Sequence, residues 1–176
     1  MNESMTWEEA TVVNEGVTAE DIIRANESKK VPPGEYLCRC ESSRPVQVFK
    51  EDYSYIAANL TFTIINVYKM YGRKPTEEEL AKYVGWKIFD NMILSHPQEK
   101  DSVRQRRILI ADRLGLIDTK AETLRKTAFS EDIVGKEIVL HTKERSYVDK
   151  ATGEEKTITQ VAFDGYYAPD EDNVPF

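Results

Sequence analysis

The sequence predicts a mainly β protein of the α+β class, with helices inserted between its strands. Apolar and polar residues alternate in five segments, which is the pattern of half-buried strands. A segment with helical spacing, Val103 to Leu114, stands between the third and the fourth of them. The last two segments are joined by a polar stretch in which Gly153 supplies turn chemistry. A chain of 176 residues accommodates one such domain with tails.

The strands are predicted at 35–42, 55–66, 86–94, 136–145 and 156–166. In the first of them Tyr36, Cys38 and Cys40 share one face, and we interpret the two cysteines as small buried hydrophobes. Two cysteines so close on one strand are too constrained to bridge each other comfortably. Together with His96 and His141 they match no zinc spacing, so neither a disulfide nor a metal site is predicted.

Helices are predicted in the segments between the strands. In the insertion 67–85, Thr76 is expected to cap a short helix through Glu79. The main helix is expected to have Pro97 in its first turn and to end just before Gly115. Further helical turns are predicted at 121–126 and 130–134.

Three strands, a helical segment and a two-stranded hairpin follow one another as in an OB-fold, a partly open five-stranded barrel. Several small barrels share this succession, and the insertion 67–85 departs from a compact barrel. In OB-folds the second and third strands, with the first and last hairpin loops, bind oligonucleotides. We therefore interpret the five strands and their helical insertions as an OB-fold barrel with flexible acidic tails.

The negative charge of the chain is concentrated at its two ends. The formal net charge is -7, residues 1–30 hold seven acids and three bases, and residues 168–176 hold three acids and no base. The body, 31–167, is therefore neutral, and it can present a basic face if its charges are segregated. We divide the chain into an acidic extension with one short helix predicted at Thr18, a nucleic-acid-binding domain and an acidic tail.

The tail from Ala168 to Phe176 has the composition of a segment that other proteins grip. Pro169 ends the last strand, three acids repel one another, and an apolar ring stands beside the terminal carboxylate. Such a tip can enter an apolar pocket while Arg or Lys of a partner pairs with the acids. The alternative is a frayed acidic terminus. The residues expected to contact a partner are Asp170, Glu171, Asp172, Val174, Pro175 and Phe176.

This tail resembles those of bacterial and phage single-stranded DNA-binding proteins, which end in Pro-Phe or Phe and recruit replication and repair enzymes. The body, 31–167, is similar in pattern to phage-type members, including Tyr71-Gly72-Arg73 and the pair Ile88-Phe89. The resemblance implies a protein that coats single strands with little sequence preference during replication, recombination or repair. It also implies a place in the cytoplasm of a bacterial host, recruitment of partners through the tail, and a possible homo-oligomer.

Single strands are held by base stacking on exposed rings and by positive charge along the phosphates. Trp86 and Phe89 point to opposite faces of their strand, so only one of them is expected to face outward. Phe49, Tyr53 and Tyr147 lie in polar loops and are expected to be exposed, the alternative for each ring being core packing. The candidates for contact with DNA are Arg44, Phe49, Lys50, Tyr53 and Tyr55, then Trp86, Lys87 and Phe89, and finally Lys143, Arg145, Tyr147 and Lys150.

The main helix is strongly basic, and its arginines have two interpretations. They could form a ridge that contacts phosphates, or a solvated face paired with nearby acids such as Glu99. The arginines are Arg104, Arg106, Arg107 and Arg113.

Other classes of function have little support in the sequence. There is no phosphate-cradling glycine loop and no recognisable Ser, His and Asp grouping, so we expect neither an enzyme nor a cofactor. A metal-dependent nuclease using Asp90 with Glu51 or Asp52 is one alternative, and a module that binds only protein is another. No apolar run approaches the roughly 20 residues of a membrane span, and Met1 to Lys30 lacks the apolar core of a signal peptide, which predicts an intracellular protein without membrane partners.

Overall fold

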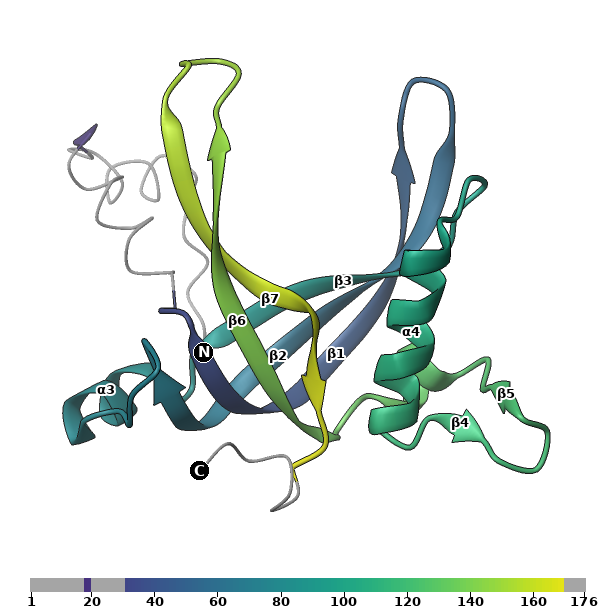
Figure 1. The fold of residues 1–176 in the computed structure, drawn as a ribbon, viewed down its shortest axis with the longest axis horizontal. Coiled ribbons are helices and arrows are strands. Elements are labelled where there is room, and N and C mark those ends of the chain that lie inside the picture. The colour runs from purple at the N-terminus through teal and green to yellow at the C-terminus, as the bar shows by residue number, and fades with distance from the viewer. Residues whose placement is uncertain (1–17, 20–30, 170–176) are drawn as a thin grey trace, which may run out of the picture. The chain divides into compact units, whose positions relative to one another are not determined.

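The computed structural model describes residues 18–19 and 31–169. The chain divides into two compact units, Met1–Lys30 and Val31–Phe176, and almost all described residues lie in the second. The elements of this unit, in chain order, are β1 (Gly34–Phe49), β2 (Ser54–Met70), α3 (Glu77–Tyr83), β3 (Lys87–Ser95), α4 (Asp101–Arg113), β4 (Ile117–Asp118), β5 (Thr123–Leu124), the π-helical turn η1 (Ala128–Asp132), β6 (Glu137–Val148) and β7 (Glu155–Tyr167) (Figure 1).

The five long strands form one antiparallel sheet in the order β3-β2-β1-β6-β7. The prediction of a mainly β protein with five strands and inserted helices is confirmed. The sheet is not closed, because no backbone ladder joins β3 to β7. The middle of the sheet is narrow, since β1 pairs with β6 only from Glu35 to Arg39.

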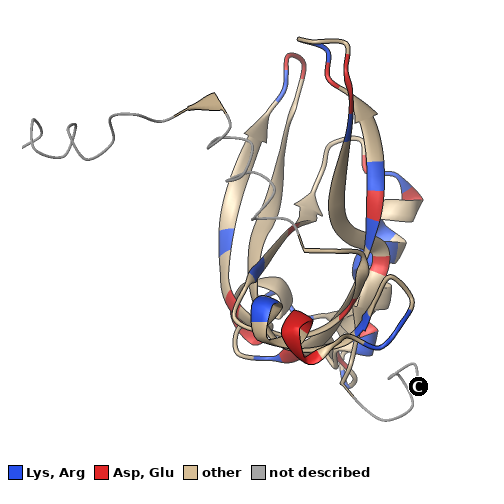
Figure 2. Cartoon of the chain, turned by 90° about the vertical axis from the view of Figure 1, so that its left-hand side faces the viewer, with Lys and Arg blue, Asp and Glu red and all other residues tan. Residues whose placement is uncertain are grey.

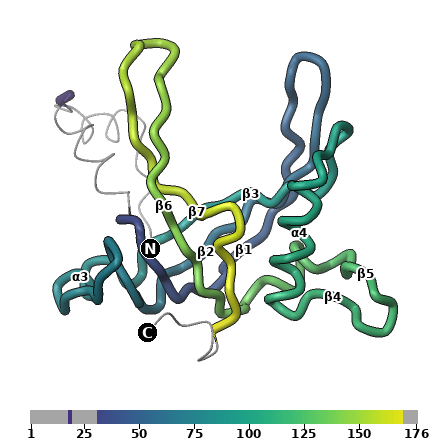
Figure 3. Tube along the Cα trace, viewed as in Figure 1, coloured from purple at the N-terminus to yellow at the C-terminus, as the bar shows by residue number. Residues whose placement is uncertain are grey.

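Beyond this narrow centre the strands continue as two hairpin arms that rise from the same side of the sheet (Figures 1 and 3). The first arm, 44–59, belongs to β1 and β2, and the second arm, 142–161, belongs to β6 and β7. The predicted strands 35–42 and 136–145 are therefore both too short at their arm ends. Alternation of apolar residues stops where an arm leaves the core, although the backbone ladder continues.

The core lies on the inner face of the sheet, where the predicted alternation is confirmed. Tyr36, Cys38 and Cys40 of β1 are fully or almost fully buried and pack in one cluster with Leu60 and Phe62 of β2. Both cysteines are free. Burial raises the pKa of the Cys40 thiol to about 11 and raises that of Cys38 as well, so both remain protonated hydrophobes at neutral pH.

Helix α4 bridges the gap between the edges of β3 and β7 through its arginines. Arg107 donates from Nη1 to the Ile93 carbonyl of β3 at 2.8 Å, and Arg113 donates to the Tyr166 carbonyl of β7 at 3.2 Å. Arg107 also pairs with Glu99 at 2.6 Å, as the sequence suggested. These guanidinium groups satisfy edge carbonyls that a closed barrel would satisfy with a ladder.

Arg106 connects both edges at once. Its Nη2 lies 3.0 Å from Oδ2 of Asp90 in β3, and its Nε donates to the Phe163 carbonyl of β7. The Tyr166 hydroxyl donates to the same Asp90 oxygen. Three arginines of α4 are thus structural, an arrangement that neither interpretation of the basic helix had described.

Two predicted helix boundaries are confirmed and three helical predictions need correction. Thr76 caps α3 with a reciprocal box to Glu79, and Gly115 follows α4 with φ of 69°. The main helix begins at Asp101 and excludes Pro97, because the His96 ring accepts the Gln98 N–H and holds a turn there. The segment 121–126, predicted as helical, belongs to the β4–β5 hairpin. The helical turn predicted at 130–134 is present as η1, but it lies two residues earlier, at Ala128–Asp132.

Several predictions lie outside the described residues, namely the helix capped by Thr18 and all six partner-binding residues from Asp170 to Phe176. Within the described ranges no helix is both long and apolar enough to cross a membrane.

Candidate nucleic-acid interface

The outer face of β1, β2 and β3 collects cations, polar groups and one exposed ring. Residues paired directly across two strands share a face, and Phe89 pairs with Thr61 between the buried positions Leu60 and Phe62. By the same register two further rows of side chains lie on this outer face, one formed by Arg39, Thr63 and Lys87 and the other by Arg44, Asn59 and Asn91. We call it the Phe89 face, and it consists of Arg39, Arg44, Asn59, Thr61, Thr63, Lys87, Phe89 and Asn91.

The chemistry of the Phe89 face suits an unpaired strand. The Phe89 side chain is 70% exposed, so its ring is available for stacking. Arg44 is exposed and makes no ion pair among the residues that the structure describes. Asn59 and Asn91, which pair with each other, can donate to and accept from base edges. Neither asparagine nor Arg39 was among the predicted contacts. Alternation along β3 already puts Asn91 on the side of Phe89, and the register adds Asn59 and Arg39.

Lys87 belongs to the Phe89 face but its charge is partly engaged. Its Nζ pairs with Glu41 and lies 2.9 Å from the Thr63 hydroxyl. The hydrogen bonds from Lys87 and Thr63 lower the pKa of the Glu41 carboxyl. Because the pair is exposed, it is weak, and a phosphate could displace the carboxylate at little cost.

Trp86 is not on the Phe89 face. Its ring packs edge-on against Tyr83 of α3, with centroids 5.0 Å apart and an interplanar angle of 71°, and contacts the core. Of these two rings, Phe89 is therefore the one that faces outward. Trp86, also predicted to contact DNA, packs against α3 and the core and does not lie with the other candidates on this face.

The first arm presents rings near its tip, as predicted. Phe49 is 74% exposed, and the Lys50 N–H closes the hairpin on the Tyr53 carbonyl at 2.8 Å. Tyr53 and Tyr55 lie beside His96, at centroid distances of 5.0 and 5.2 Å, so one side of each ring is occupied. The histidine was missed, because nothing in the sequence links the end of β3 to the arm.

In the second arm the register separates charges of opposite sign. Lys143, Arg145 and Tyr147 alternate along β6, and Tyr147 pairs with Lys156 of β7. Glu144 lies on the other side of the arm, as do Glu155 of β7 and the hydroxyl side chains of Ser146 and Thr159. We call the basic side, formed by Lys143, Arg145, Tyr147, Lys156, Ile158 and Gln160, the Tyr147 face.

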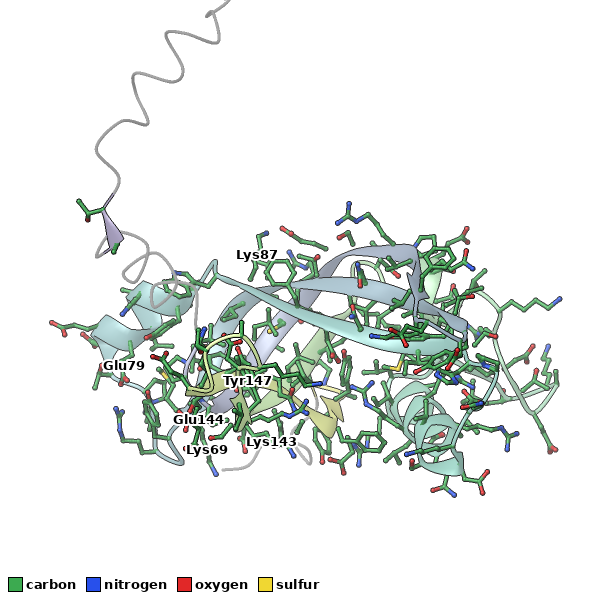
Figure 4. All side chains as sticks on the ribbon, turned by 90° about the horizontal axis from the view of Figure 1, so that it is seen from above. Lys69, Glu79, Lys87, Lys143, Glu144 and Tyr147 are labelled. Atoms are coloured by element: carbon green, nitrogen blue, oxygen red, sulfur yellow. The ribbon has the colours of Figure 1, made fainter. Side chains whose placement is uncertain are left out.

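Both arm tips still carry charges of both signs (Figure 2). Lys156 pairs with Asp149 at 2.8 Å, which with the Ala151 N–H lowers the pKa of that carboxyl, while Lys150 is exposed in the turn. Seen from above, Lys87 lies on one side of the molecule and Lys143 on the other (Figure 4). The predicted residues therefore fall on two faces, not in one groove.

A hollow of about 1030 Å³ lies elsewhere, between α4, the β4–β5 hairpin and β7. Its exposed apolar side chains are Ile108, Leu109 and Phe163, and the sequence search had named none of them. Arg106 in its wall is engaged by β3 and β7, so the hollow is apolar in character and we do not assign it to nucleic acid.

No protein-family model matches this sequence, and a search of curated proteins finds no significant match.

Proposed function

We propose that this chain is a single-stranded DNA-binding protein built on an OB-fold whose barrel stays open between β3 and β7. The order of the five strands supports the fold, and α4 lies where the barrel would otherwise close. In this interpretation the first and second arms correspond to the first and last hairpin loops of OB-folds, which flank the oligonucleotide site.

The observation that carries the proposal is the Phe89 face. It lies on β2 and β3, the strands that bind oligonucleotides in OB-folds, and it combines an exposed ring with Arg44 and two asparagines. Stacking accepts every base and phosphate contacts carry no sequence information, so the binding should be nearly indifferent to sequence.

The neutral body is compatible with this function because its charges are segregated. The Tyr147 face adds Lys143 and Arg145 to the cations that follow the strand, whereas Glu144 lies on the opposite side of the arm. The protein would coat exposed strands in the cytoplasm of a bacterial host, and the tail ending in Phe176 would recruit replication or recombination proteins.

One rival function has an observation in its favour. The apolar hollow beside α4, with Ile108 and Leu109 each 39% exposed, supports a module that binds protein. The nuclease alternative loses its proposed metal ligand, because Asp90 accepts hydrogen bonds from Arg106 and Tyr166 and lies in β3, whereas Glu51 and Asp52 belong to the tip of the first arm.

The proposal is tested by fluorescence anisotropy with an oligo-dT strand and a duplex of equal length at two salt concentrations. We expect preference for the single strand and weaker binding at higher salt, because cations displace counterions from phosphate. Phe89→Ala and Tyr147→Ala should each cost about 1 to 3 kcal/mol of binding free energy. Phe163→Ala, which removes an exposed ring away from both faces, is the control. Equal affinity for strand and duplex would refute the proposal.

A further inference from the structure

The turn after β2 presents an exposed ring on a backbone that disfavours it. Tyr71 is 62% exposed and has φ of 53°, in the left-handed region that a bulky side chain adopts only at a cost. Gly72 follows with φ of 74°. Strain of this kind persists where the surrounding structure enforces it, and such positions concentrate at binding sites.

The surrounding backbone fixes this turn. The Tyr71 N–H donates to the Pro33 carbonyl at 2.8 Å, and Met70 and Arg73 exchange backbone hydrogen bonds of 2.8 and 3.0 Å. The start of β1 lies so close that a Cβ on Gly34 would stand 2.1 Å from the Lys69 carbonyl oxygen. The backbone that carries the ring is therefore fixed before any ligand arrives, which reduces the entropic cost of binding.

Beside the ring is a depression of about 340 Å³ whose wall includes Lys69, Glu35 and His141. Glu35 Oε2 and His141 Nε2 are buried and have no hydrogen-bond partner among the described residues. Buried polar atoms are normally paired, so their position at the wall indicates that a polar group belongs there. An N–H group of a base is one such group, since carboxylates accept from base N–H donors, among them exocyclic amines and the N3–H of thymine.

The depression continues the Tyr147 face. Glu35 pairs with Lys69 on one side and with His141 on the other, so the three form one row across the sheet. From His141 the alternate residues of β6 lead through Lys143 to Tyr147, a distance of about 20 Å along the strand. Lys69 and Lys143 lie on the same side of the molecule, across from Lys87 (Figure 4).

We propose that the Tyr71 turn is a second stacking site, at which a single strand bound along the Tyr147 face passes Lys69 and places a base on the Tyr71 ring. This inference rests on the proposed function and deepens it. It gives the protein one contact beside His141 and another at Tyr147, near the arm end of β6, so strands long enough to reach both positions are held by both rings.

The decisive variant is Tyr71→Gly, which removes the ring and also relieves the left-handed backbone, so that the fold is not weakened. Tyr71→Phe keeps the ring. Glu122→Gly is the matched control, because Glu122 is exposed, has φ of 52° and lies in the β4–β5 turn away from both faces. Lys69→Gln is compared with Lys120→Gln in that same turn.

Affinity is measured with oligo-dT of about 6 and about 30 nucleotides, lengths near the lower limit of and well above the usual site of one OB-fold. We expect Tyr71→Gly to weaken the long oligomer about five-fold or more and to leave the short one within about two-fold, with Lys69→Gln acting in the same direction. Tyr71→Phe, Glu122→Gly and Lys120→Gln should bind the long oligomer like the unaltered protein.

Two outcomes overturn the inference while leaving the proposed function in place. One is unaltered binding of the long oligomer by Tyr71→Gly, and the other is an equal loss for both lengths, which would assign Tyr71 to the primary site. If the unaltered protein binds neither oligomer, it is the proposed function that fails. Photocross-linking of a halogenated oligomer, mapped by mass spectrometry, should label Tyr71 only with the long strand.

Discussion

Arg106→Ala should weaken the link between the edges of β3 and β7, since this α4 side chain bonds to both of them. The substitution removes the ion pair with Asp90 and the hydrogen bond to the Phe163 carbonyl. It also removes the cation from above the Phe163 and Tyr166 rings, where Cζ lies 5.4 and 5.8 Å from the centroids. Asp90 would keep only the Tyr166 hydroxyl as its donor.

The size of the effect follows from burial. The Arg106 and Asp90 side chains are 11% and 18% exposed, so removing the arginine leaves a mostly buried carboxylate with half of its partners. Breaking a buried pair in this way costs about 3 to 5 kcal/mol, and the remaining exposure and the Tyr166 bond place the expected loss near the lower end, about 3 kcal/mol. In the double variant with Asp90→Asn no unpaired buried charge remains. Its loss of unfolding free energy should therefore be smaller than the sum of the losses of the two single variants.

Urea unfolding monitored by tryptophan fluorescence measures this loss as a lower midpoint with an unchanged slope. Arg104→Ala is the matched control, because Arg104 lies on the same helix, is exposed, and its side chain makes no hydrogen bond among the described residues; its effect should stay within about 0.5 kcal/mol. Hydrogen exchange should accelerate in β3 and β7 of the Arg106 variant. A loss below about 1 kcal/mol would show that α4 does not hold the two edges together.

Three further predictions concern charge and the tail. Lys143→Ala should lower the slope of log affinity against log salt by about 1, whereas Glu144→Ala, one residue away on the other side of the arm, should not lower it; equal slopes would contradict the assignment of the Tyr147 face. Removing Ala168 to Phe176 should leave DNA affinity unchanged or raise it at low salt, and deleting Phe176 alone should abolish capture of partner proteins while the DNA isotherm stays the same; a shortened protein that still captures them would mark an ordinary terminus. Burial lowers the pKa of the His141 imidazole in the folded chain below its usual 6.5, so as the pH falls the unfolded chain is protonated at this residue before the folded chain is. The free energy of unfolding should therefore decrease as the pH drops below about 6.5 towards the folded pKa. In urea titrations, His141→Gln should lack that part of the decrease.

The inner faces of the strands could be predicted because alternation is a local property. Tyr36, Leu60 and Ile88 are buried where the sequence placed them, since each lies in a run with period two. The capping box at Thr76 was readable for the same reason, because donor and acceptor stand three residues apart.

Features that depend on contacts between distant segments could not be predicted in this way. The β4–β5 hairpin was assigned to a helix, although the partly buried Ile117 and Leu124 pair across it and pack on the core. The arginines of α4 looked like surface charges, because their acceptors are carbonyls of β3 and β7 that are remote in the chain.

The sequence by itself determined which residues of the first three strands share a face and that only one of Trp86 and Phe89 is expected to face outward. The tertiary structure decided which one, because Tyr83 of α3 supplies the surface against which Trp86 packs. It also decided that Phe89 shares a face with Arg44, and that Tyr147 of β6 lies beside Lys156 of β7 in an arm whose two strands are both exposed. Period two assigns residues to the sides of a single strand, whereas only the pairing register between strands determines which side chains become neighbours.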